Sequence, residues 1–110
     1  MTEARPLVLQ PDHTLHLMGI GGVGMSGMAG ILAGRGFTVT GSDRSESPRL
    51  DELRRLGVTI STPQVAGGAG NADAVVISTA ISPANPELAD ARERGLPVYH
   101  RSELLAALVA

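Results

Sequence analysis

The sequence predicts an α/β fold: a doubly wound, five-stranded parallel sheet with strand order 3-2-1-4-5. Short apolar segments alternate with segments of helical periodicity along the 110 residues. Aromatic residues make up only 2% of a chain that is 43% hydrophobic. The core must therefore be aliphatic, which is common in parallel sheets covered on both faces. The first apolar segment ends in a cluster of glycines, a usual position for a ligand-binding turn in this fold class.

The first half of the chain predicts three strands and two helices. Residues 1–14 are polar and weakly patterned, so we expect a flexible leader before a single domain at 15–110. Apolar segments indicate strands at 15–20, 37–40 and 58–60. Apolar side chains at helical spacing indicate the two helices between them: Met25, Met28, Ala29 and Leu32, then Leu50, Leu53 and Leu56. Gly36 and Gly57 are the expected C-terminal ends, and Ser47-Pro48 is the expected start of the second helix.

The second half predicts two strands and two helices after a loop. Residues 61–71 are rich in glycine, alanine and proline and are expected to form a surface loop. The apolar segment 74–78 predicts a buried strand, and 97–99 predicts the fifth strand. Asn85-Pro86-Glu87 is a typical helix start, and Gly95 is the expected end of that helix. Residues 101–110 predict a final helix.

The composition excludes several classes of function. A net charge of −2 and two aromatic residues give neither a basic surface nor a stacking platform for nucleic acid. No apolar run approaches the roughly 20 residues of a membrane helix. Without cysteine or a secretion signal, a cytoplasmic protein is expected. The three histidines are scattered, so no metal site is predicted, and His16, inside a predicted strand, is expected to be a structural polar residue.

The most informative motif is GIGGVG at residues 19–24, which fits G-x-G-x-x-G between a strand and a helix. Glycines let the backbone turn sharply and approach a phosphate closely. The following helix N-terminus offers free N–H groups and partial positive charge to an anion. The motif therefore predicts a phosphate-binding turn. The alternative is a turn whose glycines serve only close packing of the helix on the strand.

Two further segments fall at the carboxyl ends of predicted strands, where open α/β sheets bind ligands. Asp43 lies about 20 residues beyond the glycine turn, the spacing at which an acid accepts hydrogen bonds from ribose hydroxyls. It could equally be an exposed turn carboxylate. Residues 78–81 (STAI) follow the fourth strand and offer hydroxyl groups and backbone to a base edge, although spacing alone also allows an ordinary loop. All nine basic residues are arginine, so no lysine-bearing Walker A loop for ATP is present.

The sequence resembles the N-terminal region of the cell-wall ligases of the Mur ligase family, in particular those that join L-alanine to UDP-N-acetylmuramic acid. The likeness is carried by LHLMGIGGVGMSGMAG at 15–30, GSD at 41–43, AVVISTAI at 74–81, NPE at 85–87, ARERGLPV at 91–98 and RSELL at 101–105. It extends from about His16 to the last residue. It departs from the family at residues 62–64, where a histidine is often found, in the Ala/Gly-rich loop that follows, and at His100, where arginine is common.

The resemblance implies a Rossmann-like domain that binds the UDP part of UDP-N-acetylmuramic acid, in an enzyme of peptidoglycan biosynthesis whose ATP- and Mg-binding domain and C-terminal domain are absent from this chain. The chain alone is then expected to be inactive and to hold no catalytic residue, cofactor or metal. Carried over by position, the diphosphate would contact Gly19, Ile20, Gly21, Gly22, Val23, Gly24, Met25 and Ser26. Asp43 would hold the ribose, Ser78, Thr79, Ala80 and Ile81 would line the uracil pocket, and Ser42 and Arg101 are further candidates.

Two other functions compete with this interpretation. An NAD(P)-binding oxidoreductase domain would place a pyrophosphate on the same helix, although a full dinucleotide fold usually has about six strands. A ligand-sensing regulatory module would use the same turn and should present a dimerisation surface. The best candidate for such a surface is the apolar stripe of the last helix, Leu104, Leu105, Leu108 and Val109, which could instead pack on the sheet or on a neighbouring domain.

Overall fold

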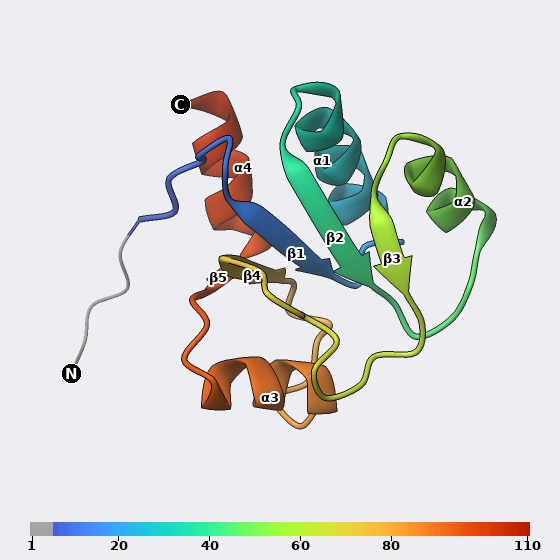
Figure 1. The fold of residues 1–110 in the computed structure, drawn as a ribbon, viewed down its shortest axis with the longest axis vertical. Coiled ribbons are helices and arrows are strands. Elements are labelled where there is room, and N and C mark those ends of the chain that lie inside the picture. The colour runs from blue at the N-terminus through green and yellow to red at the C-terminus, as the bar shows by residue number, and fades with distance from the viewer. Residues whose placement is uncertain (1–5) are drawn as a thin grey trace.

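The computed structural model describes residues 6–110 and has one five-stranded parallel sheet. The elements in chain order are β1 (Thr14–Met18), α1 (Val23–Gly34), β2 (Thr38–Ser42), α2 (Pro48–Arg55), β3 (Thr59–Ser61), β4 (Ala74–Ile77), α3 (Pro86–Glu93), β5 (Val98–His100) and α4 (Arg101–Val109). The strands are arranged β3-β2-β1-β4-β5, and each pair is parallel (Figure 1). The predicted fold class and strand order are confirmed.

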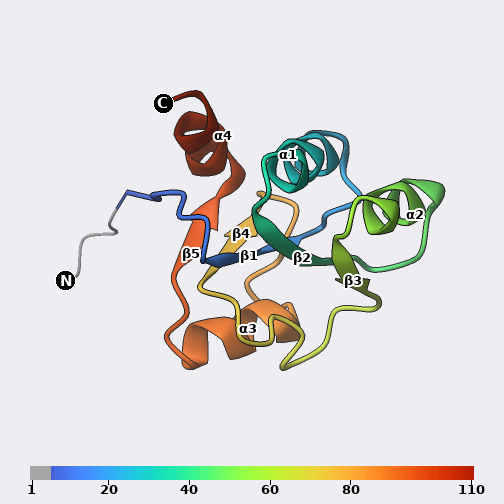
Figure 2. The same cartoon turned by 45° about the horizontal axis from the view of Figure 1, so that its top comes forward.

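The two faces of the sheet are covered unequally. Helices α1, α2 and α4 pack on one face, whereas α3 and the segment 62–73 lie on the other (Figures 1 and 2). The strand side chains alternate accordingly: Leu15 and Leu17 enter the larger core beneath α1, and Met18 enters the smaller core beneath α3. The same alternation in β4 sends Val76 to the larger core and Val75 to the smaller one.

The helix boundaries follow the predicted capping residues closely. Proline stands in the first turn of both α2 and α3, and the Asn85 side chain caps α3. Gly36, Gly57 and Gly95 follow the first three helices, each with φ between 77° and 95°. This left-handed conformation is accessible to glycine at little cost, which explains why each helix stops where it does.

Besides shifts of one or two residues at the ends of the other strands, the structure differs from the sequence prediction in four details. β2 continues through Gly41 to Ser42, so the predicted turn begins two residues later. Leu56, expected on the buried stripe of α2, is 58% exposed because α2 ends before it. The apolar stripe of α4 is divided, since Leu104 and Leu108 are buried while Leu105 and Val109 are exposed. The segment 61–71, expected as a surface loop, begins with the last residue of β3 and includes the buried residues Gln64 and Ala69.

The predicted leader is only partly described, because residues 1–5 lie outside the described residues. Within the described part, Leu7 and Leu9 pack against the larger core. Its flexibility and the domain boundary stay predictions. Helices long and apolar enough to cross a membrane are absent from residues 6–110.

Candidate functional site

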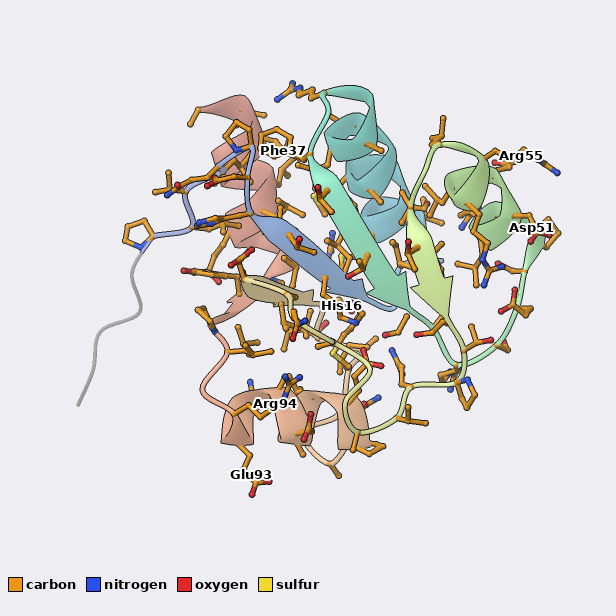
Figure 3. All side chains as sticks on the ribbon, viewed as in Figure 1. His16, Phe37, Asp51, Arg55, Glu93 and Arg94 are labelled. Carbon is orange, nitrogen blue, oxygen red and sulfur yellow. The ribbon has the colours of Figure 1, made fainter. Side chains whose placement is uncertain are left out.

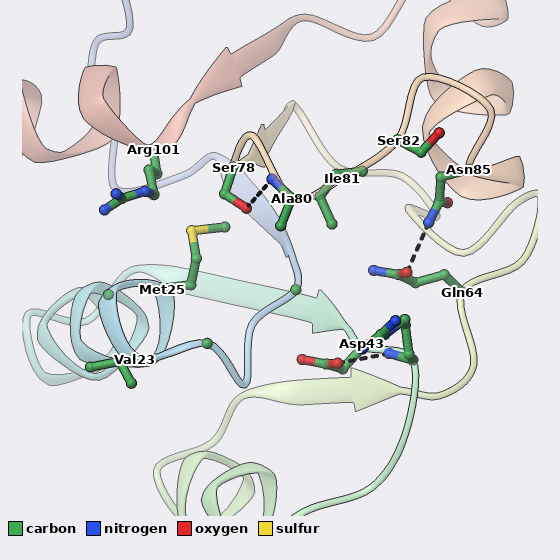
Figure 4. Close-up of a pocket in the computed structure, with 14 residues that line it drawn as sticks. Val23, Met25, Asp43, Gln64, Ser78, Ala80, Ile81, Ser82, Asn85 and Arg101 are labelled. Atoms are coloured by element: carbon green, nitrogen blue, oxygen red, sulfur yellow. Dashed lines mark hydrogen bonds between the residues drawn. The ribbon is translucent and has the colours of Figure 1, made fainter.

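A pocket of about 650 Å³ opens at the carboxyl edge of the sheet. Residues that follow each of the five strands contribute to it: Gly19 after β1, Asp43 after β2, Gln64 after β3, Ser78 after β4 and Arg101 after β5. The remaining lining residues come from the same loops and from the start of α1 (Figure 4): Gly22, Val23, Gly24, Met25, Arg44, Ala80, Ile81, Ser82 and Asn85. Parallel strands place these segments together because all their carboxyl ends meet at one edge.

Most of the sequence-predicted site residues line this pocket, and five do not. Ile20 is fully buried in the larger core, and Ser42 is fully buried on the other side of the sheet. Gly21 does not line the pocket but contacts Asp43, which does: a Cβ built on Gly21 would stand 2.8 Å from Asp43 Oδ2. The Ser26 hydroxyl donates to the Val23 carbonyl at 3.1 Å, and Thr79 is exposed but absent from the pocket lining.

The N-terminus of α1 forms one end of the pocket. Gly22 is its N-cap residue, and among the described residues no side chain caps this helix or places a carboxylate in its first turn. The first N–H groups of a helix have no intrahelical acceptor and carry partial positive charge. Arg101 adds a full positive charge beside them, because a Cβ on Gly24 would stand 3.2 Å from Arg101 Nη1. This end of the pocket is therefore suited to bind an anion.

The Asp43 carboxylate holds the glycine turn from the middle of the pocket. Its Oδ2 accepts a hydrogen bond from the Gly21 N–H at 2.8 Å, and its Oδ1 accepts one from the Arg44 N–H at 2.7 Å. Arg49 holds the same turn from outside, donating from Nη1 to the Gly21 carbonyl at 2.9 Å. Each carboxylate oxygen retains acceptor capacity, so Asp43 can orient the turn and still accept hydrogen bonds from a ligand.

Side chains that the sequence analysis did not select form the other end of the pocket. Gln64, Ser82 and Asn85 line it, and Asn85 Nδ2 donates to Gln64 Oε1 at 2.8 Å. Asn85 was predicted only as a helix cap, and Gln64 was placed in a surface loop. Gln64 is instead buried, with a relative exposure of only 9%. The sequence did offer one indication of Gln64, because it follows the third strand. Residues after the carboxyl ends of strands are where this fold class binds ligands, and the same rule selected Asp43 and residues 78–81.

A buried polar network supports this end from beneath. Glu87 Oε1 accepts one hydrogen bond from the Ser42 hydroxyl at 2.5 Å. The same oxygen lies 2.7 Å from His16 Nε2. His16 Nδ1 lies 2.7 Å from Thr40 Oγ1, and both His16 and Glu87 are almost fully buried. Figure 3 shows His16 on the side of the sheet that faces α3. The predicted structural role of His16 is confirmed, since it links β1 and β2 to the start of α3.

Two further polar groups shape the loops around the pocket. His100 is the N-cap of α4: its Nδ1 accepts from the Ser102 N–H at 3.2 Å, and its own N–H donates to Glu103 at 2.7 Å. It thereby fixes the helix start that carries Arg101. Glu46 accepts hydrogen bonds from Arg54 and from the Thr62 hydroxyl, and these lower its pKa from 4.5 to about 2.

The chemistry of the pocket favours binding over bond making. It offers helix N–H groups, two guanidinium groups, one carboxylate and two carboxamides. Across residues 6–110, histidine and acidic side chains do not gather in a group of three that could hold a metal ion. The arrangement suits an elongated polar ligand with an anionic group at the α1 end.

The family model, the curated relatives and the ligase structures that match this chain all point to the same family. Residues 14–110 match the model of the Mur ligase family, catalytic domain. The UDP-N-acetylmuramate–L-alanine ligase of Kineococcus radiotolerans is 54% identical, over 87% of this chain and 21% of that relative. The chain thus spans about a fifth of the length of the curated relatives it matches.

Two solved structures extend the comparison. The crystal structure of UDP-N-acetylmuramate-alanine ligase from Thermotoga maritima superposes with a TM-score of 0.83 and 33% identity, covering 88% of this chain and 23% of that one. The UDP-N-acetylmuramate:L-alanyl-gamma-D-glutamyl-meso-diaminopimelate ligase from Neisseria meningitides gives a TM-score of 0.75 and 28% identity, over 81% and 28%. With the family model matching nearly all of the described residues, the chain belongs to the Mur ligase family and corresponds to its N-terminal domain.

Proposed function

We propose that this chain binds the UDP part of UDP-N-acetylmuramic acid as the first domain of an ATP-dependent ligase. That ligase adds L-alanine to the lactyl carboxylate of the sugar nucleotide during peptidoglycan precursor synthesis in the cytoplasm. The relatives named above act on UDP-N-acetylmuramate by name. The single observation that carries the proposal is the uncapped N-terminus of α1 with Arg101 beside it.

The diphosphate would lie against the start of α1. Its charge is there balanced by the helix N–H groups and the Arg101 guanidinium. Gly22 and Gly24 carry no side chain, which leaves room for the phosphate oxygens at the start of α1. This role needs no lysine, in agreement with the composition of the chain.

The ribose and base would extend from the diphosphate toward Gln64. Asp43, in the middle of the pocket, accepts hydrogen bonds from ribose hydroxyls, the role an acid after the second strand commonly has. Ser78, Ala80 and Ile81 form one wall beside the base, with Ile81 half-buried and apolar. The chain thereby positions the substrate, while chemistry with ATP and Mg belongs to the domains that the whole ligase adds.

Calorimetric titration of the purified chain tests this proposal. UDP-N-acetylmuramic acid and UDP should bind with similar enthalpy, because the contacts involve the shared UDP part, and NAD should bind at least tenfold more weakly. Preference for NAD would move the chain to the oxidoreductase class. A stable dimer whose ligand affinity depends on dimerisation would favour the regulatory module.

A second measurement concerns activity. The chain alone, supplied with ATP, Mg, L-alanine and UDP-N-acetylmuramic acid, should release no ADP above the rate without protein. The reason is that the chain has no lysine and therefore no Walker A loop to hold the γ-phosphate of ATP. Alanine-dependent ADP release by the chain would contradict this part of the proposal.

A further inference from the structure

The pocket has a polarity along its length. In Figure 4, Val23, Met25 and Arg101 lie toward one end, Asp43 and Ile81 lie between, and Gln64 and Asn85 lie at the other end. A nucleoside diphosphate with its phosphates at α1 and its ribose at Asp43 therefore directs its base toward Gln64. The edge of the base farthest from the ribose is the one that reaches this end.

The orientation of the Gln64 carboxamide is fixed by a relay that starts at a helix cap. Asn85 Oδ1 accepts the Glu87 N–H at 3.0 Å and the Leu88 N–H at 3.4 Å. Backbone N–H groups can only donate, so this atom must be the oxygen, and Asn85 Nδ2 must face Gln64. That nitrogen donates to Gln64 at 2.8 Å, so the contacted Gln64 atom must be the carbonyl oxygen. The Gln64 nitrogen is consequently turned the other way.

The Gln64 nitrogen is left without a partner. Nε2 is buried and makes no hydrogen bond to any residue among those the structure describes. In Figure 4 it points away from Asn85, toward the space between Ile81 and Asp43. A buried donor without an acceptor costs free energy, and native structures usually satisfy such groups. Its direction into the pocket indicates that the acceptor belongs to the ligand.

We propose that Gln64 determines base specificity by donating a hydrogen bond from Nε2 to the O4 carbonyl of uracil. This inference rests on the proposed binding of a uridine nucleotide. O4 lies on the edge across the ring from the glycosidic bond, whereas O2 lies beside that bond and nearer to Asp43. Cytosine carries an amino group in place of O4, so it would oppose one donor with another. Asn85 acts as a positioning residue, because it holds the amide in the orientation that selects uracil.

The test compares UDP with CDP in wild type and in Gln64→Glu, with calorimetric affinities as the readout. Glutamate has the shape of glutamine and keeps an oxygen for Asn85, but it replaces the free donor with an acceptor. Wild type should bind UDP at least tenfold more tightly than CDP. Gln64→Glu should lose at least tenfold in UDP affinity and prefer CDP, whose amino group can donate to the carboxylate. Gln10→Glu is the matched control, since Gln10 is exposed and does not line the pocket, and it should keep the wild-type ratio.

Asn85→Asp tests the relay without changing the group that contacts the base. Aspartate keeps the oxygen that caps α3 but loses the donor to Gln64, so the Gln64 amide can turn its oxygen into the pocket. The UDP-to-CDP affinity ratio should fall at least fivefold while the backbone amide spectrum stays dispersed.

The outcomes separate this inference from the proposed function. Tight UDP binding by wild type without preference over CDP overturns the role of Gln64 and leaves the proposed function standing. An unchanged ratio in Gln64→Glu and Asn85→Asp has the same meaning. Absence of binding by UDP, CDP and UDP-N-acetylmuramic acid to wild type overturns both. If Gln64→Glu does not fold, the wild-type ratio and Asn85→Asp still decide.

Discussion

The two ends of the pocket differ in the groups that they present: mainly backbone at the α1 end and side chains at the Gln64 end. The α1 end uses backbone: a glycine turn, an uncapped helix start and one arginine that approaches Gly24. The Gln64 end uses side chains, held by the Asn85 cap and by the buried network of Glu87, His16 and Ser42. Backbone donors suit a phosphate of any nucleotide, whereas an oriented carboxamide can discriminate between bases. In the binding mode proposed above, one end supplies affinity and the other supplies selectivity.

The largest expected effect on ligand affinity comes from a substitution that distorts the glycine turn at the α1 end. Gly21→Val should reduce UDP-sugar binding below detection, because its Cβ would stand 2.8 Å from Asp43 Oδ2 and 3.3 Å from Leu50. The carboxylate must then move and release the turn. Gly27→Val is the control, since nothing lies within 4 Å of a Cβ there, and calorimetry should give wild-type affinity. Equal affinity in both variants would mean that the Asp43–Gly21 contact does not organise the site.

The next effect concerns the support beneath the Gln64 end. Glu87→Ala should lower the free energy of unfolding by about 3 kcal/mol, because it leaves His16 and Ser42 buried without their shared acceptor. Chemical denaturation monitored by circular dichroism measures this. Glu93→Ala, on the exposed side of the same helix, should change it by no more than about 0.5 kcal/mol. A similar small change in Glu87→Ala would show that the network is dispensable.

A smaller effect is expected where the two ends meet. Asp43→Ala should weaken UDP binding by about 1–3 kcal/mol, the range for losing a hydrogen bond to a charged group. The loss combines a missing ribose acceptor with a freer Gly21 turn. Asp12→Ala removes an exposed carboxylate outside the pocket and serves as the control. Wild-type affinity in Asp43→Ala would leave Asp43 as a turn residue only.

The smallest effect is a pH dependence of the segment that leads to Gln64. Hydrogen bonds from Arg54 and Thr62 lower the pKa of Glu46 from 4.5 to about 2 in the folded protein. Because the folded pKa is the lower one, this contribution to stability is complete above about pH 5 and is lost as the pH falls toward about 2. Glu46 is exposed, so solvent screens the interaction and the change is small.

Thermal unfolding at several pH values measures the Glu46 effect. The melting temperature of wild type should fall slightly more than that of Glu46→Gln across this pH range, since the amide does not titrate. Glu52→Gln, on the exposed face of α2, should follow wild type. If the melting temperatures of wild type and Glu46→Gln depend on pH in the same way, Glu46 makes no pH-dependent contribution to stability.

Local patterns in the sequence were sufficient for the fold and for the α1 end. Apolar periodicity and capping residues such as Ser47 and Gly95 predicted each strand and helix, and the glycine motif located the turn. The end of α2 was misjudged because Leu56 matched the apolar spacing beyond the last helical residue. Ser42 lies outside the pocket because β2 continues through Gly41 to Ser42, and strand alternation then points the Ser42 side chain toward Glu87.

The Gln64 end could not be predicted in the same way. Gln64 and Asn85 are 21 residues apart and belong to segments with no shared pattern, and their contact exists only because the loop after β3 reaches the start of α3 in the fold. The position of Gln64 after the third strand indicated the pocket edge, but nothing in the Ala/Gly-rich sequence around it indicated that its side chain would be buried. The same holds for the role of His16, whose partners lie 24 and 71 residues away.

The most direct test of the account is an NMR titration of the chain with UDP-N-acetylmuramic acid, following backbone amides and the Gln64 side-chain amide, with NAD in a parallel sample. We predict shifts at Gly22 to Met25 and at Asp43 together with a downfield shift of the Gln64 side-chain protons, and at most weak shifts with NAD. Shifts confined to NAD, or a saturating UDP-sugar titration that leaves the α1 turn unperturbed, would contradict the assignment of this pocket to a uridine diphosphate.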